Sequence, residues 1–140
     1  MHDISLGQTI EDYLTGERID ATTYEDLRQA LARLLVEEKG YPKEQLRPRV
    51  AVSFPVDGKE YTRLADLVAY DETGSPLILF LFCSGVVTTY ERETLAAARI
   101  IEKGPAPLAV VTDTKDASLL CVADGERIAQ SMQALPSWSG

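Results

Sequence analysis

The side chains of this sequence best suited to chemistry are carboxylates. Asp66 stands within an apolar segment, residues 64–70. Three more acids stand where helices are predicted to begin, namely Glu25, Glu91 and Glu93. Mg²⁺ takes several oxygen ligands, so one aspartate alone holds it poorly. A metal site at Asp66 therefore requires a second acidic residue from another element, with Lys115 as the nearest lysine late in the chain.

The glutamates also have an ordinary structural interpretation. Thr22 and Thr88 each precede a glutamate by three residues, which is the capping-box pattern of a helix N-terminus. In this pattern the threonine hydroxyl accepts a hydrogen bond from a backbone amide, and the glutamate reaches back to the cap. We therefore predict that Glu25 and Glu91 are capping residues and that Glu93 complements the helix dipole.

Asp66 has a similar alternative. An aspartate at a strand end commonly caps a turn or pairs with a cation, and Arg28 and Arg63 are the candidate partners. The two interpretations differ in what surrounds the carboxylate. A metal site needs further acids near Asp66, whereas a structural role needs an arginine or backbone amides.

Composition excludes several other catalytic classes. The chain has one histidine, His2, and two cysteines, Cys83 and Cys121, each within an apolar segment. A Cys/His metal site or a Ser/His catalytic pair cannot be assembled from so few side chains. We expect both cysteines to be buried free thiols.

The formal net charge of -8 opposes binding to nucleic acid. Proteins bind phosphate backbones through cations that displace condensed counterions, and this chain is acidic overall. Three arginines do cluster in sequence, and we interpret them as a solvated edge: Arg47, Arg49 and Arg63. We therefore expect DNA binding to be weak or absent.

No segment of the sequence has the pattern of a membrane span. The apolar segment over residues 75–87, which lies within the longest uncharged run (73–90), is shorter than the roughly 20 apolar residues that a span needs. The first residues also lack the basic start of a secretory signal. We expect a soluble cytoplasmic protein without a membrane partner.

The length of 140 residues suits one domain, with an N-terminal arm (1–21), a core (22–134) and a loose tail (135–140). Apolar periodicity, turn residues and helix stops predict the elements of the core. These are a helix over 23–39, a hairpin of strands over 49–54 and 62–70, a buried strand over 77–83, a helix over 90–103, strands over 108–112 and 117–122, and a short helix through Ile128 and Met132.

The connection between two of these strands is informative. A strand, a helix and a second strand in succession form a right-handed crossover, so the strands near 77–83 and 108–112 are predicted to be parallel neighbours. The strand over 77–83 is apolar on both faces, as expected of a central strand covered by helices on each side. The predicted fold is α/β, with a mixed sheet flanked by helices.

Several motifs in this order resemble a known family. They are residues 12–17, 24–29, 38–42, 65–71 and 107–113 (DYLTGE, YEDLRQ, EKGYP, ADLVAYD and PLAVVTD). Together they resemble the N-terminal domain family of type I restriction enzyme R subunits, within the PD-(D/E)xK nuclease superfamily. The resemblance implies a restriction-endonuclease-like fold, a prokaryotic setting and a Mg²⁺-dependent DNA nuclease ancestry.

The resemblance also implies where the chemistry should lie. The family holds Mg²⁺ with an aspartate, matched here by Asp66, and with a glutamate on the next strand, followed two residues later by a lysine. Phe82 and Ser84 stand at those two positions, with Cys83 between them as in the family's triplet. Because a phenyl ring and a hydroxyl replace the ligand and the lysine, the resemblance implies a degenerate active site.

Three functions remain open from the sequence. The first is a non-catalytic nuclease-like domain, without a cofactor, that serves as a binding or assembly module for a protein partner. The second is a divergent Mg²⁺ nuclease in which Glu25, Glu91 or Glu93 joins Asp66. The third is a homo-oligomeric structural protein whose former site became core or a dimer interface around the aromatic residues Phe80, Phe82 and Tyr90.

Overall fold

The computed structural model describes residues 5–138, so the expectations for His2 and for the two ends of the chain lie outside the described residues. The elements in chain order are β1 Ser5–Glu11, β2 Arg18–Thr22, α1 Glu25–Glu37, η1 Lys43–Gln45, β3 Leu46–Val56, β4 Lys59–Tyr70, β5 Pro76–Phe82, η2 Val87–Tyr90, α2 Glu91–Ile100, β6 Leu108–Thr112, β7 Ala117–Cys121, β8 Arg127–Gln130 and η3 Met132–Ala134. Within these residues neither helix has the length and apolar composition of a membrane span.

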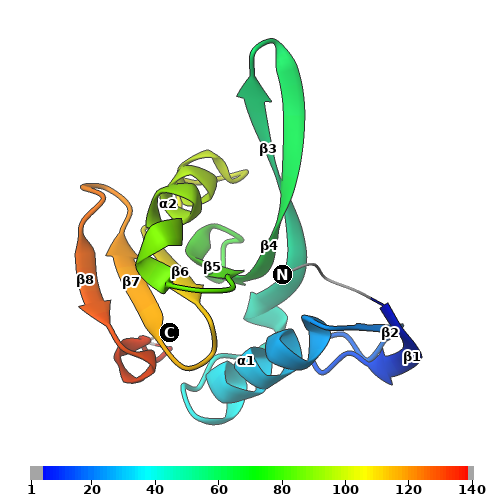
Figure 1. Cartoon of the computed structure of the whole chain (residues 1–140). Helices are drawn as coiled ribbons and strands as arrows, with labels where there is room; N and C mark the ends of the chain where they lie inside the picture. The colour runs from blue at the N-terminus through cyan, green and yellow to red at the C-terminus, as the bar shows by residue number, and fades with distance from the viewer. Residues whose placement is uncertain (1–4, 139–140) are drawn as a thin grey trace.

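A six-stranded mixed sheet forms the centre of the molecule, in the order β3-β4-β5-β6-β7-β8. All neighbouring strands are antiparallel except β5 and β6, which are parallel and joined through α2. The predicted crossover is therefore confirmed. A separate two-stranded hairpin, β1-β2, forms the N-terminal arm and lies beside α1 (Figure 1).

The two helices cover opposite faces of the sheet. Alternate residues of β5 divide between two cores: Ile78, Phe80 and Phe82 pack with α1, whereas Leu79 and Leu81 pack with α2. Since side chains of a strand alternate between its faces, a strand buried on both sides must be apolar throughout. The prediction of an α/β fold with a flanked mixed sheet is confirmed.

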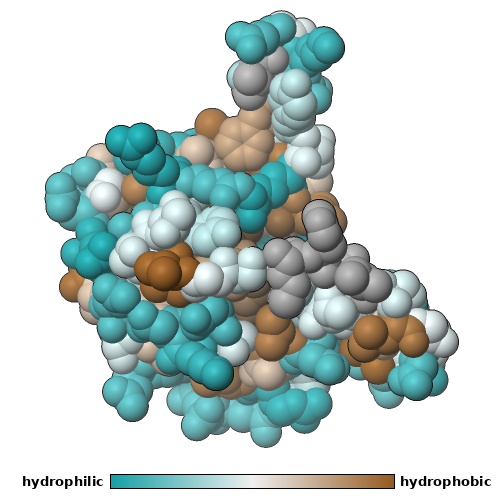
Figure 2. All heavy atoms as spheres, viewed as in Figure 1, coloured by the Kyte–Doolittle hydropathy of each residue, from teal (hydrophilic) through white to brown (hydrophobic). Residues whose placement is uncertain are grey.

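The hairpin of β3 and β4 is longer than predicted and projects from the body of the molecule (Figure 1). Asp57 and Gly58 connect its strands with φ values of 49° and 77°, as a type I′ turn requires. Figure 2 shows hydrophilic residues at the hairpin tip and hydrophobic ones toward its base. The base is the part that joins the core and positions Asp66.

Two predictions for the C-terminal part are wrong. The segment through Ile128 is strand β8, paired antiparallel with β7, and only Met132–Ala134 form a short 3-10 helix. Ile128 is 56% exposed, so no core selects a helix here, and pairing with β7 satisfies the backbone instead.

The residues expected to form a loose tail pack onto the domain as far as they are described. Leu135 is buried, and the indole ring of Trp138 lies 5.6 Å from the ring of Tyr41. The Trp138 amide donates to the carbonyl of Lys39, and the Tyr41 hydroxyl donates to the carbonyl of Pro136. These contacts fix residues 135–138 beside the end of α1.

Candidate functional site

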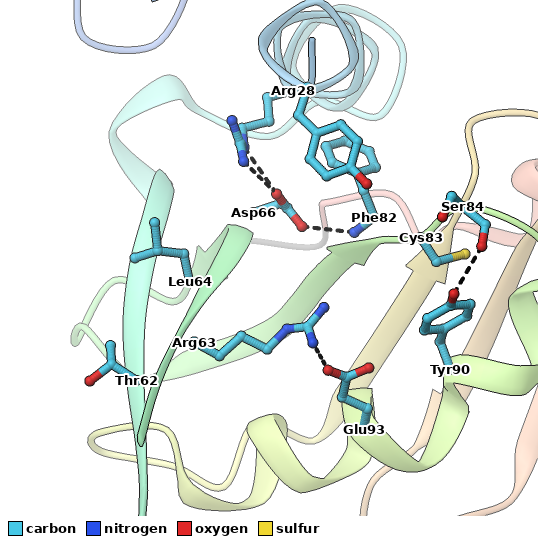
Figure 3. Close-up of a pocket in the computed structure, with 11 residues that line it drawn as sticks. Arg28, Thr62, Arg63, Leu64, Asp66, Phe82, Cys83, Ser84, Tyr90 and Glu93 are labelled. Carbon is cyan, nitrogen blue, oxygen red and sulfur yellow. Dashed lines mark hydrogen bonds and ion pairs between the residues drawn. The ribbon is translucent and has the colours of Figure 1, made fainter. Parts of the chain in front are cut away.

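A cleft of about 520 Å³ opens where β4 and β5 approach the N-terminal end of α1 (Figure 3). Asp66, Phe82 and Ser84, the three positions singled out from the sequence, all line it. Its walls are aromatic and apolar side chains together with two arginines and two acids: Tyr24, Arg28, Arg63, Leu64, Asp66, Phe82, Cys83, Tyr90 and Glu93, with Thr62 and Ser84. The predicted site positions are thus brought together by the fold.

Both carboxylate oxygens of Asp66 accept hydrogen bonds from the protein. Oδ1 accepts from Nε of Arg28 at 3.0 Å and lies 2.9 Å from its Nη2. Oδ2 accepts from the backbone amide of Phe82 at 2.8 Å. The predicted alternative of an arginine partner is therefore confirmed, and the partner is Arg28 (Figure 3).

The electrostatics of Asp66 are dominated by its burial. Removal from water raises the pKa of this carboxyl above its ordinary value, and the Phe82 amide and Arg28 only partly offset that rise. Because burial disfavours the charged form of Asp66, that form depends on the hydrogen-bond donors around it. These donors are the Phe82 amide and the buried guanidinium of Arg28.

The capping role predicted for Glu25 is wrong. Helix α1 begins at Glu25 with Tyr24 as N-cap, and no side chain caps it. The Glu25 carboxylate instead accepts from Nη1 of Arg28 at 2.7 Å and from Nη1 of Arg49 at 3.1 Å. Two guanidinium groups from α1 and β3 outcompete the local cap because their charged hydrogen bonds are stronger than one to a backbone amide.

One further buried carboxylate, which no chemical signal in the sequence marked, completes this arrangement. Asp12, which follows β1 and is 2% exposed, accepts from Nε2 of Gln29 at 2.8 Å and from the amide and hydroxyl of Thr15. Nη2 of Arg49 lies 3.6 Å from Asp12 Oδ1. No sequence signal marks Asp12 as buried, because its burial depends on the hairpin folding back against α1.

Burial raises the pKa of Asp12, but the hydrogen bonds from Gln29 and Thr15 outweigh it, so the net shift is downward. Asp12 and Asp66 thus differ in sign although both are buried. The difference follows from the balance at each carboxylate: hydrogen bonds outweigh burial at Asp12, whereas burial outweighs the donors at Asp66.

The other two acids have their own arginines. No side chain caps α2, whose N-cap is Tyr90, so the capping prediction for Glu91 is wrong. The Glu91 carboxylate accepts from Nε of Arg127 at 2.7 Å, and Glu93 forms an ion pair with Arg63 across the cleft (Figure 3). Each glutamate is thus held by an arginine, Glu91 by Arg127 and Glu93 by Arg63.

Phe82 belongs to the core on the α1 side. It is 4% exposed, and its ring centroid lies 6.3 Å from that of Tyr24. Phe80 is fully buried in the same core, so neither phenylalanine offers an exposed surface to a second copy. Ser84 takes part through its backbone carbonyl, which accepts from the Tyr90 hydroxyl at 3.0 Å.

The lysine and one of the two cysteines singled out from the sequence lie away from the places expected for them. Lys115 sits in the turn between β6 and β7, where its amide donates to Asp113, and it does not line the cleft. Cys83 and Cys121 are free, and only Cys83 is buried. Burial, with Asp113 nearby, raises the pKa of the Cys83 thiol.

The arginines predicted to form one solvated edge have three separate partners. The Arg47 guanidinium lies 4.8 Å from the centroid of the Tyr70 ring. Arg49 contacts Glu25, and Arg63 contacts Glu93. They do not form a shared basic patch for a phosphate backbone.

The Mg²⁺ ion that the resemblance implies does not fit these residues. The guanidinium of Arg28 lies against both acids that would approach the ion, Glu25 and Asp66. Phe82 supplies a ring instead of a carboxylate, and within residues 5–138 no three acidic, histidine or cysteine side chains gather to hold a metal. Hard cations need oxygen ligands with open lone pairs, and this donor set offers a positive charge in their midst.

Comparison with known proteins identifies the family. The family model for the type I restriction enzyme R protein N terminus matches residues 23–136, which include both helices, the whole six-stranded sheet and all lining residues of the cleft. No curated protein and no solved structure matches the chain significantly. The six-stranded mixed sheet with its flanking helices is restriction-endonuclease-like. The chain therefore belongs to the family of type I restriction enzyme R protein N-terminal domains.

Proposed function

We propose that this chain is a non-catalytic restriction-endonuclease-like domain that serves as a binding or assembly module. The observation that carries the proposal is the state of Asp66, whose two oxygens both accept from protein donors. The positions that would complete a metal site hold Phe82 and Ser84. A phenyl ring cannot replace a carboxylate ligand of the metal, and a serine cannot replace a lysine that offsets charge on a phosphate. The catalytic groups that hydrolysis would need are therefore missing at these positions.

The cleft supports a binding role better than a catalytic one. Its charges are already paired, Arg28 with Asp66 and Arg63 with Glu93. A phosphate backbone would have to compete with those carboxylates, and the net charge of -8 further opposes its approach. The aromatic and apolar walls suit a side chain of a protein partner, which we expect in place of DNA.

A plasmid-cleavage assay tests the loss of chemistry. Purified protein is incubated with supercoiled and linear DNA in Mg²⁺ or Mn²⁺, alongside the Asp66→Ala variant. We expect no cleavage above the background of the variant. Metal-dependent cleavage that disappears in Asp66→Ala would overturn the proposal and favour a divergent nuclease.

A gel shift at low and moderate salt tests the expected partner class. We expect no retarded duplex at moderate salt, because an acidic chain cannot displace many counterions. Size-exclusion chromatography with light scattering, run on the same samples, tells whether the second copy acts as the partner. Tight, salt-resistant DNA binding would contradict the protein-partner expectation.

A further inference from the structure

Three buried carboxylates converge beside the cleft from three elements. Asp12 follows β1, Glu25 begins α1 and Asp66 lies on β4, and each is 5% exposed or less. A buried carboxylate is costly unless a counter-charge and hydrogen bonds compensate it. With Arg28 and Arg49 these residues form a unit that we call the acid–arginine cluster.

Arg28 occupies the central place in the acid–arginine cluster. Its Nη1 donates to Glu25 Oε1 at 2.7 Å, while its Nε and Nη2 reach Asp66 Oδ1 at 3.0 and 2.9 Å. Its side chain is 7% exposed. A single cation thus joins the acid of α1 to the acid of β4.

Arg49 approaches Glu25 from the opposite strand of the hairpin. It adopts a φ of 56° within β3, where the register leaves it opposite Asp66 between the pairs Pro48–Leu67 and Val50–Ala65. Left-handed backbone is costly for a residue other than glycine and is retained where surrounding contacts favour it. The contacts here are Glu25 and Asp12.

We propose that Arg28 is the resident cation of this site and supplies, between Glu25 and Asp66, the positive charge that a divalent ion would otherwise have to supply. The inference rests on the proposed function and deepens it. A guanidinium tethered to α1 is always present, so the domain folds without metal. The same tether keeps a free ion from the two carboxylates.

This assignment predicts a gain of metal binding when the tethered charge is removed. Arg28→Gln removes the cation that Glu25 and Asp66 share, while Arg49 stays on Glu25 and the Phe82 amide stays on Asp66. Mn²⁺ is then expected to raise the unfolding temperature, by about 5 °C at a tenfold excess over its dissociation constant and further with the logarithm of its concentration above that. Wild-type protein is expected to show the same unfolding temperature in Mn²⁺ and in EDTA.

Two controls make the experiment specific. Arg33→Gln removes an arginine from the same helix whose partner Glu37 is exposed, and it is expected to remain insensitive to Mn²⁺. The double variant Arg28→Gln/Asp66→Asn removes one carboxylate and is expected to lose the response. A folded Arg28→Gln that ignores Mn²⁺, or a double variant that responds equally, overturns the inference.

The outcome is decisive even where Arg28→Gln does not fold alone. In that case Mn²⁺ added during refolding must restore the native circular dichroism spectrum, and failure to do so contradicts a cation-replacing role. The two proposals also fail separately. Mn²⁺-stabilised, DNA-cleaving wild-type protein refutes the proposed function, whereas an inert wild type with an unresponsive Arg28→Gln refutes only the resident cation.

Discussion

Arg28 and Asp66 are separated by 38 residues in sequence and form an ion pair whose side chains are 7% and 8% exposed. The pair connects α1 to β4 on the face of the sheet that Phe82 also occupies. Removing either partner is expected to be costly in free energy of unfolding, because the other charge would stay buried where water cannot solvate it.

Arg28→Gln is expected to lower the free energy of unfolding by about 3 to 5 kcal/mol. The loss arises because Glu25 and Asp66 stay buried without their shared cation. Urea denaturation in EDTA, followed by circular dichroism, measures it. Arg33→Gln, whose ion pair with Glu37 is 60% and 55% exposed, should change stability by about 1 kcal/mol or less. Equal effects of the two variants would show that Arg28 has no special role.

Asp66→Asn is expected to change the pH dependence of stability. Folding raises the pKa of Asp66 above 3.8, so the folded state binds this proton more tightly than the unfolded chain does. The resulting stabilisation is fully present below that unfolded pKa and is lost as the pH rises through the folded pKa. From about pH 4 upward, wild type should therefore lose stability relative to the variant. Urea titrations at several pH values check this, and a difference that stays constant contradicts it.

Asp12→Asn should show the opposite dependence. Folding lowers the pKa of Asp12 below 3.8, so the folded state favours the carboxylate. The stabilisation is present above the unfolded pKa and disappears as the pH falls through the folded value. Wild type should thus exceed the variant near neutral pH and converge toward it below about pH 4. A wider gap in acid would refute the assignment.

Phe82→Ala is expected to cost about 3 to 5 kcal/mol, because it empties a core position that is 4% exposed. Val86, which follows two residues beyond Ser84 and is 65% exposed, provides the control. Val86→Ala should change stability by about 0.5 kcal/mol or less. Thermal or urea unfolding distinguishes the two, and a mild Phe82→Ala would mean that the ring does not belong to the core.

The C-terminal segment is expected to unfold together with the domain. Trp138 is the sole tryptophan, and its ring packs against Tyr41, so its fluorescence reports this contact. The fluorescence transition should coincide with that of circular dichroism. Tyr41→Phe, which removes the hydrogen bond to Pro136, should lower stability by about 1 kcal/mol. An earlier, separate fluorescence transition would mean that the segment detaches first.

Much of the sheet could be predicted from local pattern. The Asp57–Gly58 turn, the doubly apolar β5 and the strand–helix–strand order specify the hairpin, the central strand and the parallel pair, because each depends on nearby residues or on chain handedness. Strand β8 and the packing of Trp138 depend on distant surfaces. In such short segments the apolar residues are too few to show a helix or strand periodicity, so the sequence does not predict their structure.

The candidate site divides in the same way. The pattern Thr-x-x-Glu is local, and it led to capping roles for Glu25 and Glu91 that the structure contradicts. Arg49 and Arg127 approach these glutamates from strands far along the chain. A charged partner across the fold outweighs a backbone cap, and sequence spacing cannot reveal it.

The sequence by itself determined that Phe82 and Ser84 stand at the two positions for which the resemblance implies a glutamate and a lysine. Only the tertiary structure decided what Asp66 binds instead. Strand alternation and residue type are local properties, whereas the meeting of Arg28, Glu25 and Asp66 follows from the packing of α1 on the sheet. Because the interior has a low dielectric constant, each of these buried charges depends on its partner, and the ion pair holds α1 against β4.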